Sequence, residues 1–76
     1  MTFEQEIRAI IADVADLTPD DVSDDAVLKS NLGLDSLELV DLAQQLENRF
    51  AIEVADSDVR ASMTVRELIT LVQSMA

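Results

Sequence analysis

The sequence predicts an all-α fold, a small four-helix bundle of three principal helices and one short helix, with a long loop between the first and second helices. Three segments carry apolar residues at helical spacing, and each follows a Ser/Thr/Asp-x-x-Glu/Gln capping signal. The alternation of apolar and polar residues that marks a strand is confined to Ile52-Glu53-Val54. We expect Ile52 and Val54 to fill the bundle from a loop.

The first helix is expected over residues 3–15. Five apolar residues recur on one side of this segment: Phe3, Ile7, Ile10, Ile11 and Val14. Thr2 and Gln5 have the spacing of a capping box, in which each side chain accepts a hydrogen bond from the backbone N–H of the other residue. Further on, Thr18 followed by Pro19 suits one short helical turn rather than a continuation of this helix.

The segment from Pro19 to Leu34 is long for a connection in so small a domain. Loops of this length are functional or disordered unless other contacts fix them. Apolar residues that can hold it against the helices are Val22, Val27, Leu28, Leu32 and Leu34. Gly33, the only glycine, stands just before the second helix, where we expect a backbone conformation that a Cβ would penalise.

The second helix is expected over residues 36–50, with Asp35 as its N-cap and Glu38 as the reciprocal partner. At 100° per residue, one arc of this helix is apolar and suits the core: Leu39, Leu42, Ala43, Leu46 and Phe50. Leu37 and Val40 lie outside that arc. Because one apolar stripe suffices to join a bundle, they indicate a docking surface. The alternative is that the preceding loop covers them.

The rest of the chain predicts one short and one long helix. A stretch from Asp56 to about Ala61 has room for one or two turns, anchored by Val59. Thr64 and Glu67 form another capping box. Apolar residues then recur at helical spacing to the end of the chain: Leu68, Ile69, Val72 and Met75.

Length and composition narrow the class of protein. Residues 1–76 are expected to form a single domain, because a chain of this size has room for one hydrophobic core. The first residues lack the basic and apolar regions of a signal peptide, and no apolar run approaches membrane-spanning length. We therefore expect a cytoplasmic protein with no membrane insertion, and a monomer.

The charge points to the kind of partner. Sixteen acidic residues against five basic ones give a formal net charge of −11. Such a charge repels the phosphates of nucleic acids and anionic membrane surfaces, so basic protein surfaces are the expected partners.

The chain is not expected to be an enzyme. It contains no histidine and no cysteine, so a nucleophilic serine would lack its usual base and a catalytic zinc its usual ligands. No metal centre is expected. The acidic run from Asp20 to Asp25 also lacks the Asp-x-Asp-x-Asp-Gly loop and late Glu of an EF-hand.

Ser36 is the candidate functional residue. It opens the second helix between Asp35 and Leu37, where its hydroxyl is expected to face solvent beside unpaired backbone N–H groups. A serine without a base is better suited to be modified than to react. The Asp35-Ser36-Leu37 step, preceded by Leu32-Gly33 in the middle of an acidic helical chain, resembles the acyl carrier proteins.

This resemblance covers essentially the whole chain and implies a function. Ser36 matches the serine to which a phosphopantetheinyl transferase attaches 4'-phosphopantetheine from coenzyme A, with Asp35 and Leu37 beside it. The arm's thiol would then carry acyl groups as thioesters for fatty acid, polyketide or specialised acyl transfer. Positions that the family uses to dock synthases, reductases and acyltransferases with basic surfaces match Leu37, Glu38, Val40, Asp41 and Glu47.

The resemblance also implies where the acyl cargo would lie, and the chain departs from the family's pattern at several positions, of which Arg49 is one. Leu39, Leu42 and Leu46 would border the cavity that shelters an acyl chain. Arg49 stands at an end of the second helix that is often acidic in the family.

Two alternatives stay open. A peptidyl or aminoacyl carrier protein shares the fold and the serine, although Gly33-Leu34-Asp35 fits the acyl type better. Outside the carriers, the chain would be an acidic helical interaction module that binds a basic partner.

Overall fold

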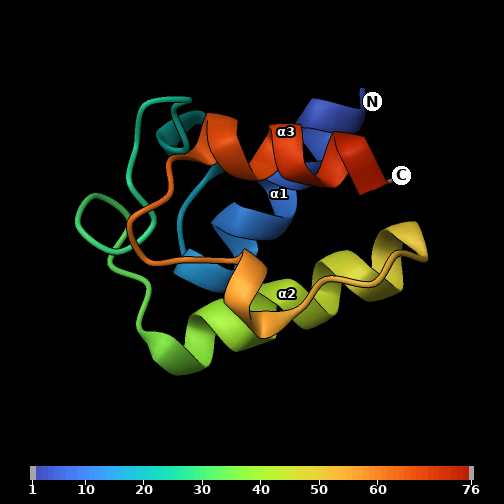
Figure 1. Cartoon of the computed structure of the whole chain (residues 1–76). Helices are drawn as coiled ribbons and strands as arrows, with labels where there is room; N and C mark the ends of the chain where they lie inside the picture. Colours follow the sequence, from blue (N-terminus) through green and yellow to red (C-terminus); the bar gives the residue numbers. More distant parts are fainter. Residues whose placement is uncertain (1, 76) are drawn as a thin grey trace.

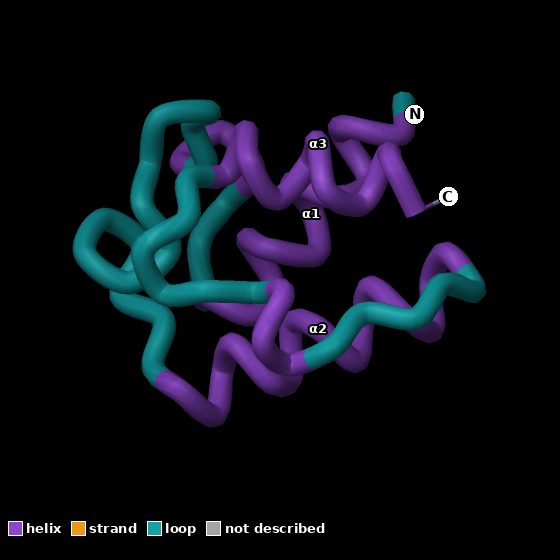
Figure 2. Tube along the Cα trace, viewed as in Figure 1, coloured by secondary structure: helices purple, strands orange, loops and turns teal. Residues whose placement is uncertain are grey.

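The computed structural model describes residues 2–75, which form three α-helices, two 3-10 turns and the loops that join them (Figures 1 and 2). The helices are α1 (Phe3–Ala15), α2 (Ser36–Phe50) and α3 (Val65–Met75), and the turns are η1 (Pro19–Asp21) and η2 (Asp56–Asp58). The described residues contain no strand, and a single isolated bridge pairs Val27 with Thr64. The predicted all-α bundle is confirmed, and its short helix is the turn η2. Met1 and Ala76, the ends of the expected domain, lie outside the described residues.

The predicted capping boxes set the starts of the helices. At α1, Thr2 N–H donates to Gln5 Oε1 at 3.0 Å and Gln5 N–H donates to Thr2 Oγ1 at 3.2 Å. At α3, Thr64 N–H donates to Glu67 Oε1 at 3.0 Å and Glu67 N–H donates to Thr64 Oγ1 at 3.2 Å. Each pair satisfies two backbone N–H groups that a helix start otherwise leaves without partners.

The C-terminal ends of α1 and α2 lie in the left-handed region without the help of glycine. The capping residues are Asp16, with φ 58°, and Ala51, with φ 55°. Asp tolerates this conformation better than most residues, whereas the Cβ of Ala crowds the following carbonyl oxygen. Ala51 is therefore a position where the fold bears a small conformational cost.

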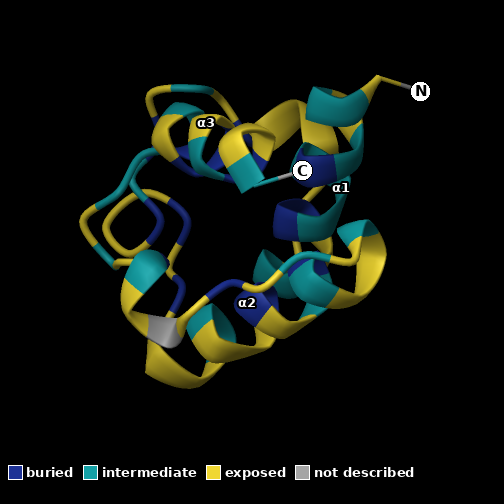
Figure 3. Cartoon of the chain, turned by 45° about the vertical axis from the view of Figure 1, so that its right-hand side comes forward, coloured by how far each residue is buried: buried dark blue, intermediate teal, exposed yellow. Residues whose placement is uncertain are grey.

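One hydrophobic core joins the three helices, the loop and the segment after α2. Every helix turns its buried face inward, as Figure 3 shows by colour. The fully buried side chains include Ile7 and Ile11 of α1, Leu42 and Leu46 of α2, and Leu68, Ile69 and Val72 of α3. The expected apolar arc of α2 is confirmed, and its first and last residues along the helix, Leu39 and Phe50, are only partly buried. Val54 is buried from a loop and Ile52 packs against the core, as predicted.

The turn η2 is shorter than the expected helix from Asp56 to about Ala61. It ends at Asp58, and Val59 follows in an extended conformation (φ −100°, ψ 103°) with its side chain buried. The extended course lets the carbonyl oxygen of Ala61 accept the N–H of Lys29 at 3.2 Å. A continued helix would have withdrawn this carbonyl from the neighbouring loop.

The loop of residues 22–35 (the connecting loop) runs beside the segment that leads into α3, and both lie at the same end of the molecule in Figures 1 and 2. Leu28 N–H donates to Met63 O at 3.0 Å, and Val65 N–H donates to Ala26 O at 2.9 Å. The expected apolar residues hold it: Val22, Leu28, Leu32 and Leu34 are buried and Val27 is half-buried. The loop is therefore fixed along its length.

Gly33 serves the backbone conformation and not the packing. Its φ is +73°, and a Cβ built on it would have no atom within 4 Å. Its N–H donates to Lys29 O at 3.0 Å and closes the turn before α2. The expectation for this residue is confirmed. In residues 2–75, no helix combines the length and the apolar character needed to cross a membrane.

Candidate functional site

Ser36 is the first residue of α2 and is exposed. Asp35 caps the helix, because its Oδ1 accepts the N–H of Glu38 at 2.8 Å while its own N–H donates to Glu38 Oε1 at 3.1 Å. Within residues 2–75 no hydrogen bond engages the hydroxyl of Ser36. The hydroxyl thus stands open to solvent at the positive end of the helix dipole.

The backbone is held in place by buried side chains and hydrogen bonds both before and after Ser36. Two residues before it, Leu34 is 1% exposed and its N–H donates to Leu28 O at 3.1 Å. After it, Leu39 N–H donates to Asp35 O at 2.9 Å, and Leu42 is fully buried. An exposed hydroxyl held between two buried side chains can be presented to a partner in one geometry.

Leu37 and Val40 form an apolar patch beside Ser36. Leu37 is 81% exposed and Val40 is 37% exposed. The alternative that the connecting loop covers them is wrong, because the apolar side chains of that loop turn into the core instead. An exposed leucine next to an exposed serine is a feature that folding alone does not require.

The predicted acidic docking residues differ in how free they are. Asp41 is exposed and accepts a hydrogen bond only from Gln45 Nε2 at 3.2 Å among the described residues. Glu38 is half-buried by its capping role, which the sequence predicted. Glu47 is half-buried as well, and its Oε1 accepts the N–H of Val54 at 3.3 Å, a tie that no sequence signal indicated. Of these three acidic residues, Asp41 is therefore the one whose carboxylate holds no backbone group of the described fold.

The leucines expected to border an acyl cavity are part of the core, where Leu42 and Leu46 are fully buried and Leu39 is partly buried. The described residues form hollows elsewhere. A small one of about 100 Å³ is lined by Arg60, Ser62, Met63 and Glu67.

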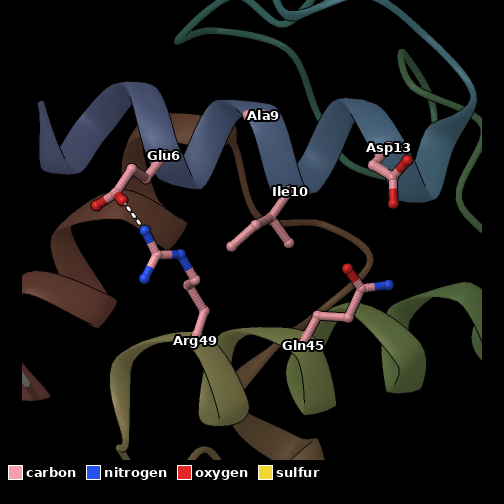
Figure 4. A pocket seen from close by; sticks show the side chains of 6 residues that line it. All are labelled: Glu6, Ala9, Ile10, Asp13, Gln45 and Arg49. Carbon is pink, nitrogen blue, oxygen red and sulfur yellow. Dashed lines mark hydrogen bonds and ion pairs between the residues drawn. The ribbon is translucent and has the colours of Figure 1, made fainter. Parts of the chain in front are cut away.

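A larger hollow of about 210 Å³ lies between α1 and α2, with Ile10 between its two ends (Figure 4). Arg49 reaches from α2 across one end of this hollow to an ion pair with Glu6 of α1. Its guanidinium also lies 5.8 Å from the ring centroid of Phe50. Arg49 thus joins α2 to α1. This contact gives a structural reason for a basic residue at an end of the helix that is often acidic in the family.

Sequence reasoning missed a charged cluster behind the connecting loop. Asp24 is ion-paired with Arg8 of α1 and with Arg66 of α3. These hydrogen bonds, from Arg8 first and Arg66 second, hold the pKa of the Asp24 carboxyl below its usual value. The sequence of the run from Asp20 to Asp25 invites comparison only with a calcium-binding loop and gives no sign of these ion pairs. Among the described residues, no group of three or more candidate ligands could hold a metal ion.

Known proteins match this chain over nearly its whole length. Residues 5–72 match the family described as "phosphopantetheine attachment site". The acyl carrier protein of Chlamydia trachomatis serovar L2 is 36% identical over 73 residues, which cover 96% of this chain and 95% of the relative. That of Campylobacter hominis is 30% identical over 75 residues, covering 99% and 95%, and that of a Sulfurovum species is 29% identical, covering 99% and 100%.

The chain belongs to the acyl carrier protein family. The resemblance seen in the sequence is confirmed, and with it the function of a phosphopantetheine-carrying acyl carrier protein. The cofactor of such a domain is covalently attached 4'-phosphopantetheine. The residues fit this group, because Ser36 offers a free hydroxyl at a helix start whose N–H groups suit a phosphate. The matched relatives carry the name of acyl carriers, which favours the acyl type over the peptidyl alternative.

Proposed function

We propose that Ser36 is the sole attachment point for 4'-phosphopantetheine and that the chain, as one carrier domain over residues 1–76, delivers acyl thioesters to partner enzymes in the cytoplasm. The observation that supports this is the placement of Ser36. It is exposed at the start of a 15-residue helix, between the buried Leu34 and the exposed Leu37.

The attachment needs little from this chain beyond a well-placed oxygen. Ser36 Oγ forms the new bond to the phosphorus of the arm as the pyrophosphate bond of coenzyme A breaks, and adenosine 3',5'-bisphosphate leaves. We assign the hydroxyl proton of Ser36 to a base of the transferase, because this chain has no histidine and the adjacent carboxylate of Asp35 is engaged in capping the helix. The positive end of the α2 dipole then favours the negative phosphodiester by about 0.3–1 kcal/mol. The chain itself is therefore a carrier and not an enzyme.

Docking would use the patch beside Ser36. Leu37 and Val40 supply an apolar centre, and Asp41 supplies a negative rim that attracts a basic surface. Asp35, Glu38 and Glu47 contribute charge but also hold backbone N–H groups of the fold. The expected partners are a phosphopantetheinyl transferase and acyl synthases, reductases or acyltransferases with basic docking surfaces.

The test is to incubate the purified chain with coenzyme A and a promiscuous phosphopantetheinyl transferase and to measure the intact mass. We expect the wild type to gain one arm and Ser36→Ala to gain none while its helical circular dichroism is retained. Ser62→Ala is the matched control, since Ser62 is also exposed but lies outside a helix start. A wild type that gains no mass, or a Ser36→Ala variant that gains as much, would contradict the proposal.

The cargo is tested separately by mass spectrometry of the modified protein from cell lysate. An acyl adduct on the arm is the expected result, since the matched relatives are acyl carriers. An aminoacyl adduct would favour the peptidyl carrier alternative instead.

A further inference from the structure

Asp24 of the connecting loop is held by one arginine from each neighbouring helix. Arg8 of α1 is ion-paired to Oδ1, and its Nη1 donates to the carbonyl oxygen of Val22 at 2.9 Å. Arg66 of α3 donates to Oδ2 from Nη2 at 2.7 Å and from Nε at 3.2 Å. The backbone N–H of Arg66 also donates to Asp24 O at 3.0 Å. The loop is thus bound to two helices at one residue.

A fourth charge completes the cluster. Glu4 of α1 pairs with Nη1 of Arg66, so that Arg66 is held by two carboxylates from different segments. The four side chains carry no net charge together, within a chain of net charge −11. They are 21–43% exposed. A lone ion pair of this exposure contributes little, but a network with two donors on one oxygen is more specific in geometry. We call Arg8, Asp24 and Arg66 the loop clamp.

The loop clamp lies near the start of the connecting loop, and backbone hydrogen bonds hold the loop from there to the residues before Ser36. After Asp24, the loop is bound through Ala26 O to Val65 N–H at 2.9 Å, and through Leu28 N–H to Met63 O at 3.0 Å. It ends at Leu34, two residues before Ser36. Within residues 22–35 the loop has no helix or strand, so its order depends on these ties to other elements together with hydrogen bonds within its own turns, such as that from Leu34 N–H to Leu28 O.

We propose that Arg8, Asp24 and Arg66 are positioning residues for the modification of Ser36, because they fix the connecting loop that carries the start of α2. This inference rests on the proposed attachment at Ser36. A loop that is ordered before docking loses little conformational freedom when the transferase binds, so less of the binding free energy is spent on ordering it. Removing the charge of Asp24 takes the carboxylate partner from Arg8 and one of two from Arg66, which would loosen this end of the loop although its apolar side chains still pack in the core.

The chain offers a control with the same chemistry elsewhere. Arg49 joins α2 to Glu6 of α1, so Arg49→Gln removes an ion pair between segments far apart in sequence without touching the loop. The clamp variants are Asp24→Asn, Arg66→Gln and the double variant. If Asp24→Asn fails to fold, Arg66→Lys keeps the charge and removes only the two-nitrogen geometry.

The experiment compares two measurements on folded protein. Amide hydrogen exchange is followed at Leu28 and Leu34 of the loop, and the initial rate of transfer from coenzyme A to Ser36 gives kcat/KM. We expect the clamp variants to raise the loop exchange rates about tenfold or more and to lower kcat/KM about three- to tenfold. The double variant should be no worse than the more affected single variant, as for residues that act as one unit. Arg49→Gln should change neither measurement.

Each outcome decides between the two proposals. Wild-type exchange rates in Asp24→Asn and Arg66→Gln, unchanged kcat/KM, or equal losses in Arg49→Gln would overturn the inference. A wild type that accepts no arm would refute the assignment of Ser36 instead, and the exchange rates would then show by themselves whether the clamp orders the loop.

Discussion

Leu37→Ala is expected to weaken docking without affecting the fold. Leu37 is 81% exposed, so truncating it removes almost no packing from the folded chain. Fully burying a leucine side chain contributes about 1.5–3 kcal/mol, and most of that remains available to an interface. After allowance for the Cβ that alanine keeps, we expect a loss of about 1–2 kcal/mol in partner binding, which is about five- to thirtyfold in Kd.

The assay is calorimetric titration of the chain with its phosphopantetheinyl transferase, paired with thermal unfolding. Leu17→Ala is the matched control, because Leu17 is another exposed leucine, at 39%, that follows α1 and lies outside the patch beside Ser36. Leu42→Ala is the opposite control, since Leu42 is fully buried and its loss should cost about 2–5 kcal/mol of stability. An unchanged Kd for Leu37→Ala, or an equal loss of affinity in Leu17→Ala, would refute the docking role.

Three further predictions concern charge and backbone. Asp41→Lys should slow association with a basic partner more at low than at high salt, measured by stopped-flow, and equal rates at both salts would indicate an uncharged docking mode. Gly33→Ala should lower the free energy of unfolding by about 1–2 kcal/mol, because residue 33 has a positive φ. Ala51→Gly should raise it by up to about 1 kcal/mol for the same reason, and urea titration of both variants checks the two signs. The arginines lower the folded-state pKa of Asp24, so its stabilisation is complete above the unfolded pKa of about 4 and is lost as pH falls through the folded pKa. The melting temperatures of wild type and Asp24→Asn should therefore differ at neutral pH and converge as the pH falls below the unfolded pKa, and a difference that does not shrink on acidification would contradict this linkage.

The helices were predictable because their signals are local. A capping box spans four residues, and an apolar stripe repeats within two turns, so both can be read without knowing what the helix packs against. The starts at Thr2, Asp35 and Thr64 were all predicted and are all present. The exposure of Leu37 followed from the same reasoning, since one helix cannot turn two opposite faces into one core.

The course of the connecting loop was not predictable, because its ties join residues far apart in the sequence. Asp24 and Arg66 are 42 residues apart, and nothing near either residue marks the other as its partner. The end of η2 at Asp58 has the same cause, since the chain after it takes the conformation that lets the carbonyl of Ala61 bind the loop. Local propensity favours another helical turn there, and tertiary hydrogen bonds override it.

The placement of the arginines separates stability from docking. Arg8, Arg49 and Arg66 pair with acids of α1 and of the connecting loop, where they join elements that otherwise carry like charges. Among the described residues, none of these pairs engages Asp41 on the exposed face of α2. The charges are thereby balanced where α1 meets α2 and where the connecting loop meets α1 and α3. The face of α2 beside Ser36 keeps the negative charge of Asp41. Three of the five basic residues therefore neutralise acids where segments of the fold meet, and in the described part of the chain none of their ion pairs uses the acid that we propose for attracting a basic partner.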